Sequence, residues 1–177
     1  MDIILYGSLH GAAKRYAERL AEVTGIKAFD YKDVKDLCLY DRVIYLGAIY
    51  ASGVTGLKKT VARMSPNQEL FLATVGMVDP EDKTFFDSFR EALKKQIPPQ
   101  LFDEKKIFHL RGAIDYGRLE LKYRILMKMM HSQASKLPEE QLTAESKAVL
   151  ATYGQKVDYV DLNSLEPLIN AIKREKP

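Results

Sequence analysis

The sequence predicts an α/β fold: a doubly wound, five-stranded parallel sheet with helices on both faces. Short apolar runs, of the kind that form strands buried on both faces, alternate with segments of helical periodicity. Glycines and prolines separate the two kinds of segment. Such an alternation favours right-handed crossovers that bring the strands into one parallel sheet. The elements are expected at 2–6 (strand), 12–24 (helix), 26–29 (strand), 43–49 (strand), 57–64 (helix), 70–75 (strand), 82–96 (helix), 106–110 (strand) and from Asn163 or Ser164 onward (helix).

The first half of the chain supplies the clearest patterns. After the opening apolar run, alanine, tyrosine and leucine recur at i, i+3, i+4 and i+7, which marks one face of a helix that Gly25 ends. Residues 30–41 are polar and too short for a full helix. The strongest buried strand covers 43–49, and the helix after it ends near Ser65 and Pro66.

The second half is bounded by similar signals. Phenylalanines at helical spacing define the helix at 82–96, which Pro98 and Pro99 close. The last helix carries Glu166 in its first turn, where a carboxylate is favourable. Between strand five and that helix, 132–148 reads as a loop or linker, followed by a short helix near 144–151 that Gly154 stops.

Composition points to one globular protein. A chain of 177 residues, 46% apolar and 29% charged, is sufficient for one domain with a buried core. The net charge of +3 is too small to indicate nucleic-acid binding, and the histidines have no partners at metal-ligand spacing. We therefore expect no nucleic acid and no metal. Cys38 is the only cysteine and is expected to be buried or half-buried; with no signal peptide, the location expected is the cytoplasm.

Three loops rich in small residues follow strands one, three and four, at 7–13, 48–56 and 74–79. In a doubly wound sheet these loops meet at the carboxyl edge, where ligands bind. Gly7 and Gly11 allow a tight turn and close approach of an anion to the positive end of the first helix. No P-loop and no G-x-G-x-x-G spacing is present. The convergence still predicts a ligand site, with a phosphate at the first loop.

The sequence of these loops resembles the flavodoxins. Tyr6-Gly7-Ser8-Leu9-His10-Gly11-Ala12-Ala13 is similar to the flavodoxin phosphate loop, and Gly47-Ala48-Ile49-Tyr50-Ala51-Ser52-Gly53 to the loop that packs on the flavin ring. Arg111-Gly112-Ala113-Ile114-Asp115-Tyr116 and the basic, methionine-rich segment 123–130 resemble the flavodoxin-like, menaquinone-dependent protoporphyrinogen oxidases. The resemblance covers about residues 1–131.

The resemblance implies a single flavodoxin-like domain over 1–177, with strand order 2-1-3-4-5, an insertion at 116–160 and FMN as cofactor. Tyr50 would stack on the flavin ring. No general acid or base is assigned, because Asp115, Tyr116 and His109 have plainer roles at the surface or in the core. The implied cofactor-binding residues are Ser8, Leu9, His10, Gly11, Ala12, Ala13, Ala48, Ile49, Tyr50, Ala51, Ser52, Gly53, Thr74, Val75, Gly76 and Met77.

Two departures bear on affinity. His10 stands where the flavodoxin pattern has threonine, and Ala13 where it has serine or threonine. Each lost hydrogen bond to a charged phosphate weakens binding by about 1.5–3 kcal/mol, unless His10 itself donates. We therefore expect weaker FMN binding than in a carrier flavodoxin. A solvent-facing loop residue is the alternative role for His10.

The predicted helix 118–131 carries two apolar stripes with cations between them. Three explanations stay open: contact with a lipid surface or a quinone, contact with a second copy or a redox partner, or burial of the second stripe under 134–160. The stripes consist of Leu119, Tyr123, Leu126, Met127 and Met130, and of Leu121, Ile125 and Met129.

Three functions remain compatible with the sequence. The first is an FMN-dependent oxidoreductase that passes electrons from an organic donor, such as a porphyrinogen, to a quinone. The second is a flavodoxin-type electron carrier, against which the segment 111–131, with five cations and two carboxylates, argues mildly. The third is a relative that has lost FMN.

Overall fold

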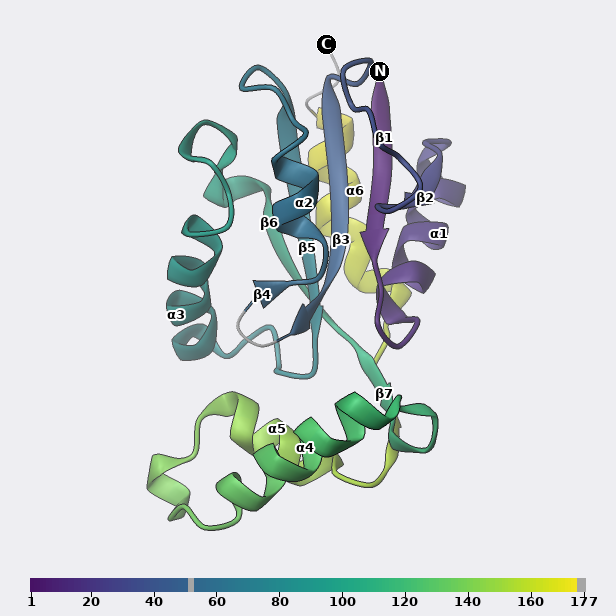
Figure 1. The fold of residues 1–177 in the computed structure, drawn as a ribbon. Helices are drawn as coiled ribbons and strands as arrows, with labels where there is room; N and C mark the ends of the chain where they lie inside the picture. The colour runs from purple at the N-terminus through teal and green to yellow at the C-terminus, as the bar shows by residue number, and fades with distance from the viewer. Residues whose placement is uncertain (51–52, 175–177) are drawn as a thin grey trace.

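The computed structural model describes residues 1–50 and 53–174 (Figure 1). Its main sheet has the order β2-β1-β3-β5-β6, all parallel, and the two-residue strand β4 pairs antiparallel with β3. The predicted doubly wound fold is therefore confirmed, with the predicted strand order. The strands are β1 (Asp2–Gly7), β2 (Ala28–Asp30), β3 (Arg42–Tyr50), β4 (Gly53–Val54), β5 (Glu69–Gly76) and β6 (Ile107–Arg111).

Helices cover both faces because alternate residues of each strand point to opposite sides. Ile4 and Ile44 pack with α1 (Ala12–Thr24) and α6 (Glu166–Arg174). Leu5 and Tyr45 pack with α2 (Leu57–Val61) and α3 (Lys83–Lys94) on the other face. Both clusters are almost fully buried, so the sheet is the common centre of two cores.

A second unit lies across the carboxyl ends of the strands. It consists of α4 (Leu121–Ala134) and α5 (Ala144–Thr152), which pack on each other below the sheet in Figure 1. An antiparallel pair, β7 (Ala113–Asp115) with β8 (Lys156–Asp158), leads into this helix pair and out of it. The five short 3₁₀ turns are Pro99–Leu101, Glu104–Lys106, Tyr116–Arg118, Glu139–Gln141 and Leu162–Leu165.

Several predicted boundaries shift for local reasons. The helix predicted at 118–131 begins at Leu121, because Asp115 accepts a hydrogen bond from the Gly117 amide and closes a 3₁₀ turn first. The predicted linker 132–148 was wrong in part, since α4 continues to Ala134. Helix α2, in contrast, ends earlier than predicted, because the amides of Arg63 and Met64 donate i→i+3 hydrogen bonds that tighten the turn at its end.

Cys38 is exposed, which corrects the expectation of a buried thiol. It lies in the irregular connection between β2 and β3, where its amide donates to the Asp36 carboxylate at 2.9 Å. Leu37, the residue before it, takes the core position instead and is fully buried. The small size and modest polarity of a cysteine therefore did not suffice to predict whether this side chain is buried.

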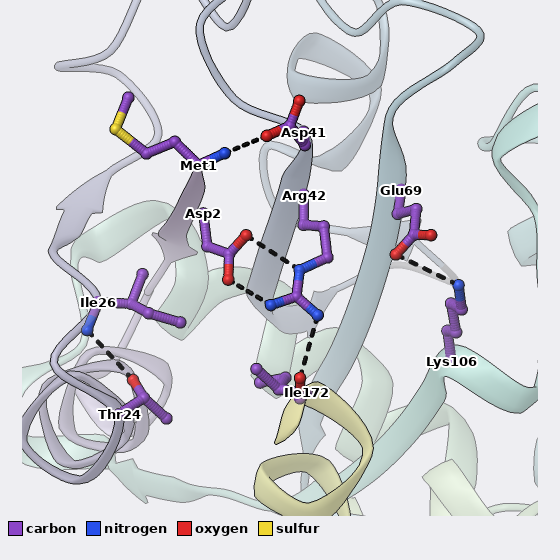
Figure 2. A network of polar contacts seen from close by, with 9 residues as sticks. All are labelled: Met1, Asp2, Thr24, Ile26, Asp41, Arg42, Glu69, Lys106 and Ile172. Carbon is purple, nitrogen blue, oxygen red and sulfur yellow. Dashed lines mark hydrogen bonds and ion pairs between the residues drawn. The ribbon is translucent and has the colours of Figure 1, made fainter. Parts of the chain in front are cut away.

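Polar contacts fasten the opposite, amino edge of the sheet (Figure 2). The Arg42 guanidinium donates to Asp2 on β1, with Nε 2.9 Å from Oδ1, and to the Ile172 carbonyl of α6 at 3.0 Å. The ammonium group of Lys106, just before β6, pairs with the carboxylate of Glu69 at the start of β5. These contacts tie β1, β3 and α6 together far from the loops that follow the strands.

Candidate functional site

A cavity of about 220 Å³ lies at the carboxyl edge of the sheet, between the ends of the strands and the α4–α5 pair. All three predicted loops reach it. Of the predicted site residues, the cavity is lined by Ser8, Leu9, His10, Ala12, Ala13, Ala48, Ile49, Tyr50, Val75, Gly76 and Met77. Gly11, Gly53 and Thr74 are not among its lining residues, and Ala51 and Ser52 lie outside the described residues.

The first loop leaves the N-terminus of α1 open. Gly11 has φ of 87°, a left-handed conformation that glycine adopts at little cost, and its amide donates to Ser8 Oγ at 3.0 Å. No side chain caps α1, and its first turn carries no carboxylate. The amides of Ala12 and Ala13 are therefore at the positive end of a 13-residue helix, a suitable place for an anion.

The loop after β3, at 48–56 and called the third loop from here on after its predicted strand, is held against β1 by Tyr45. Its hydroxyl donates to the Thr55 carbonyl at 2.5 Å, and burial raises the pKa of the phenol, so it stays a donor. A Cβ on Gly7 would lie 2.2 Å from the same carbonyl. Gly7 thus allows the third loop to pack closely on the first strand, whereas the sequence had suggested a role in anion approach.

Thr74 lies in the core behind the cavity. Its hydroxyl is 2.7 Å from Nδ1 of His109, and the His109 ring stacks on Phe86 with centroids 3.8 Å apart. Burial lowers the pKa of His109 to about 4, with the Arg90 charge acting in the same direction. The imidazole is therefore neutral at pH 7, which agrees with its expected role in the core.

Tyr123 of α4 reaches between two of the loops. Its ring meets His10 at 6.1 Å and Tyr50 at 5.5 Å between centroids, edge to face in both cases. Loss of water contact lowers the pKa of His10, and the nearby Glu120 carboxylate opposes that shift in part. His10 is thus largely neutral at pH 7 and lies beside the cavity, although its side chain keeps considerable solvent exposure.

The two apolar stripes have different surroundings. The first stripe lines the cavity and forms its roof. In the second, Leu121, Ile125 and Met129 are 71%, 61% and 52% exposed. The explanation that 134–160 folds over the second stripe is therefore wrong: α5 packs on α4 but leaves this ridge open to solvent.

The sequence did not predict that α5, or residues just outside the predicted loops, would line the cavity. Helical spacing at 144, 148 and 151 indicated α5, but no pattern indicated what the helix would cover. The missed lining residues are Val78, Phe85, Gly112, Ala113, Ile114, Glu145, Ala148, Val149 and Thr152. Most are apolar, so nothing except burial distinguishes them from other core positions.

Comparison with known proteins finds one matching domain family and several similar solved structures. A family model described as a flavodoxin domain matches residues 3–141. Similar solved structures include a mutant flavodoxin from Fusobacterium nucleatum bound to flavin mononucleotide (16% identity, 64% of this chain and 76% of that chain, TM-score 0.43) and oxidised flavodoxin 2 from Bacillus cereus (13%, 62% and 83%, 0.40).

A flavodiiron core from Synechocystis is also similar, at 13% identity and a TM-score of 0.40. The match covers 62% of this chain but only 30% of that one. No curated protein matches the sequence. Over residues 1–50 and 53–174, no helix has the length and apolar character needed to cross a bilayer.

Proposed function

The chain belongs to the flavodoxin domain family, and on that premise we propose that it binds FMN at the carboxyl edge of its sheet and uses it as an oxidoreductase. The observation that carries the proposal is the convergence of three loops and one uncapped helix N-terminus on a single cavity. Bound FMN would supply reversible transfer of one or two electrons.

The residues present fit the parts of FMN. The amides at the start of α1 suit the phosphate, and Ser8 adds a hydroxyl beside them. The apolar walls from Ile49, Tyr50 and Met77 suit a planar ring. The cavity is smaller than the roughly 300–1,000 Å³ of usual ligand sites. Tyr123, which lies between the phosphate loop and Tyr50, is the side chain that has to move for FMN to fit.

A quinone as electron acceptor and a porphyrinogen as donor form the finer part of the proposal. They rest on the resemblance of 111–130 to the menaquinone-dependent protoporphyrinogen oxidases. Within that segment, Gly112, Ala113 and Ile114 line the cavity together with the apolar face of α4. An aromatic, poorly soluble substrate would bury its surface against such a roof. Quinone reduction by the FMN-loaded protein, with a porphyrinogen as electron source, tests this part.

Titration with FMN tests the proposed cofactor. We expect saturable binding with a shifted flavin absorbance, and about 10–100-fold tighter binding when His10→Thr restores a hydroxyl to the phosphate loop. Glu22→Thr is the matched control, because Glu22 is an exposed residue near the other end of α1 and should leave the affinity unchanged. Isothermal calorimetry measures all three proteins. Failure of both the unmodified chain and the His10→Thr variant to take up FMN would favour a relative that has lost the cofactor.

We infer further that the exposed ridge of α4 lies on an anionic membrane surface, as a peripheral contact. Arg124 and Lys128, next to the ridge on α4, are both exposed, so apolar and cationic groups share one side of the helix. That combination favours the boundary of an anionic bilayer. The contact would also bring the roof of the cavity close to a lipid-soluble acceptor.

Vesicle co-sedimentation tests the ridge. Binding to phosphatidylglycerol vesicles should exceed binding to phosphatidylcholine vesicles and fall at least about tenfold in an Ile125→Asp, Met129→Asp variant. Leu39→Asp is the control, since Leu39 is 75% exposed but stands apart from the ridge. A concentration-dependent dimer that the ridge variant abolishes, without any vesicle binding, would assign the ridge to a second copy of the chain instead.

A further inference from the structure

The cavity has one carboxyl group in an otherwise mostly apolar wall. Among the described residues that line it, Glu145, on α5, is the only acidic one. The other titratable groups that line it are His10 from the first loop, Tyr50 from the third and Tyr123 from α4. With the histidine neutral at pH 7, no lining side chain supplies a full positive charge to balance a carboxylate.

Glu145 is not used to hold the fold together. Thr143 caps α5 and accepts the Ser146 amide at 3.1 Å, so the helix end does not need the glutamate as a cap. Among the residues described, none forms a hydrogen bond or an ion pair with the Glu145 carboxyl. The side chain is half-buried, which keeps it in contact with the cavity on one side and with water on the other.

The protonation of Glu145 follows from this position. A carboxylate in the first turn of a helix is normally stabilised by the helix dipole, which lowers its pKa. In Glu145 burial acts in the opposite direction and raises the pKa of the carboxyl. A carboxyl group that holds its proton more readily than usual, in an apolar cavity, can donate a hydrogen bond to a bound oxygen.

We propose that Glu145 is the catalytic acid that delivers a proton to the carbonyl oxygen of a quinone bound against the α5 wall of this cavity, beside the proposed FMN, once Tyr123 has moved aside to widen it. The inference rests on the proposed function for the supply of electrons. Reduction of a quinone to a hydroquinone consumes two electrons and two protons. Two electrons and one proton come from reduced FMN, and the second proton comes from Glu145. Its O–H bond breaks as an O–H bond forms on the quinone, and water then reprotonates the carboxylate.

The first test measures binding alone and needs no flavin. The chain has 10 tyrosines and no tryptophan, so quenching of tyrosine fluorescence by 1,4-naphthoquinone reports occupancy of a cavity that Tyr50 and Tyr123 line. Between pH 4 and pH 8 we expect binding to weaken about tenfold as the Glu145 proton is lost. Glu145→Gln should bind equally well at every pH, because the amide N–H₂ still donates.

Two control variants assign the titration. Glu140→Gln changes an exposed glutamate outside the cavity and should keep the midpoint of the unmodified chain. His10→Gln removes the imidazole that also lines the cavity, and the midpoint of the pH titration should again match that of the unmodified chain. A pH-independent affinity in the unmodified chain, or the same midpoint in Glu145→Gln, would overturn the proposal, whether or not the protein takes up FMN.

The second test uses the FMN-loaded protein. Glu145→Gln should lower kcat for quinone reduction about 100-fold with little change in KM, since a proton transfer is lost and binding is kept. An unchanged kcat at saturating quinone would contradict the role. If FMN does not bind, the proposed function fails while the fluorescence titration still decides the place of Glu145.

Discussion

Replacing Arg42 by alanine is expected to lower the free energy of unfolding by about 3–5 kcal/mol. Arg42 is 5% exposed, and the side chain of its partner Asp2 is only 15% exposed. Removal of the guanidinium leaves a nearly buried carboxylate without its main counter-charge and frees the Ile172 carbonyl of α6. Both groups lost water contacts on folding, so losing the guanidinium that they share costs much folding free energy (Figure 2).

Urea denaturation followed by circular dichroism measures the loss. Arg19→Ala is the matched control, because Arg19 forms an i,i+3 pair with Glu22 on the surface of α1, where both side chains are about half exposed or more. That pair should contribute less than about 0.5 kcal/mol. Equal effects of the two substitutions would show that the Arg42–Asp2 contact adds no more than a surface ion pair.

An effect at Arg42 should leave the cavity itself intact. The contact lies at the amino edge of the sheet, whereas the loops that line the cavity follow the carboxyl ends of β1, β3 and β5. Provided the chain is folded, FMN affinity of Arg42→Ala should match that of the unmodified chain. The two edges of one sheet thus have separate tasks, anchoring of α6 at one and the proposed ligand contact at the other.

The sheet and most of its loops could be predicted because both depend on local patterns. Each parallel strand is buried on two faces, so it appears as an apolar run, and each crossover helix shows one apolar face. Strand order followed from the resemblance and agrees with the pairing of β3 between β1 and β5. Eleven predicted site residues then meet at one cavity because parallel strands end at one edge.

The roof of the cavity could not be predicted in the same way. The sequence gives this helix two apolar stripes, and only the packing of the folded chain decides which of them faces the sheet. Glu145 gives no signal either, since glutamate in the first turn of a helix is ordinary. Its lack of an ion-pair partner among the described residues is a property of the tertiary structure.

The sequence indicated which loop glycines matter, but not which close contact each of them allows. Loop glycines after strands suggested a phosphate site, and Gly11 is indeed left-handed at the start of α1. Gly7, Gly47 and Gly56, in contrast, all adjoin the buried side chain of Tyr45. A contact between one tyrosine and three glycines from different segments has no local sequence signature, because its members are brought together only when β1, β3 and the third loop pack.

Substitution of Gly56 by alanine is the second large effect expected, a loss of about 2–5 kcal/mol from the free energy of unfolding. At φ of 79° a side chain costs about 1–2 kcal/mol. The new Cβ would also lie 2.4 Å from the Tyr45 hydroxyl and 2.6 Å from the Tyr31 ring, both in the core, which adds about 1–3 kcal/mol of overpacking. Thermal and urea denaturation measure the loss.

Gly25 offers a matched control for the clash. Its φ of 74° is nearly the same, but a Cβ there meets nothing within 4 Å, so Gly25→Ala should show only the backbone cost. The difference between the two variants therefore isolates the clash with Tyr45 and Tyr31. Because Tyr45 holds the third loop on β1 through the Thr55 carbonyl, Gly56→Ala should also weaken FMN binding in the folded protein, and Gly25→Ala should not. Equal stability losses, or equal FMN affinities, would mean that the third loop tolerates displacement of Tyr45.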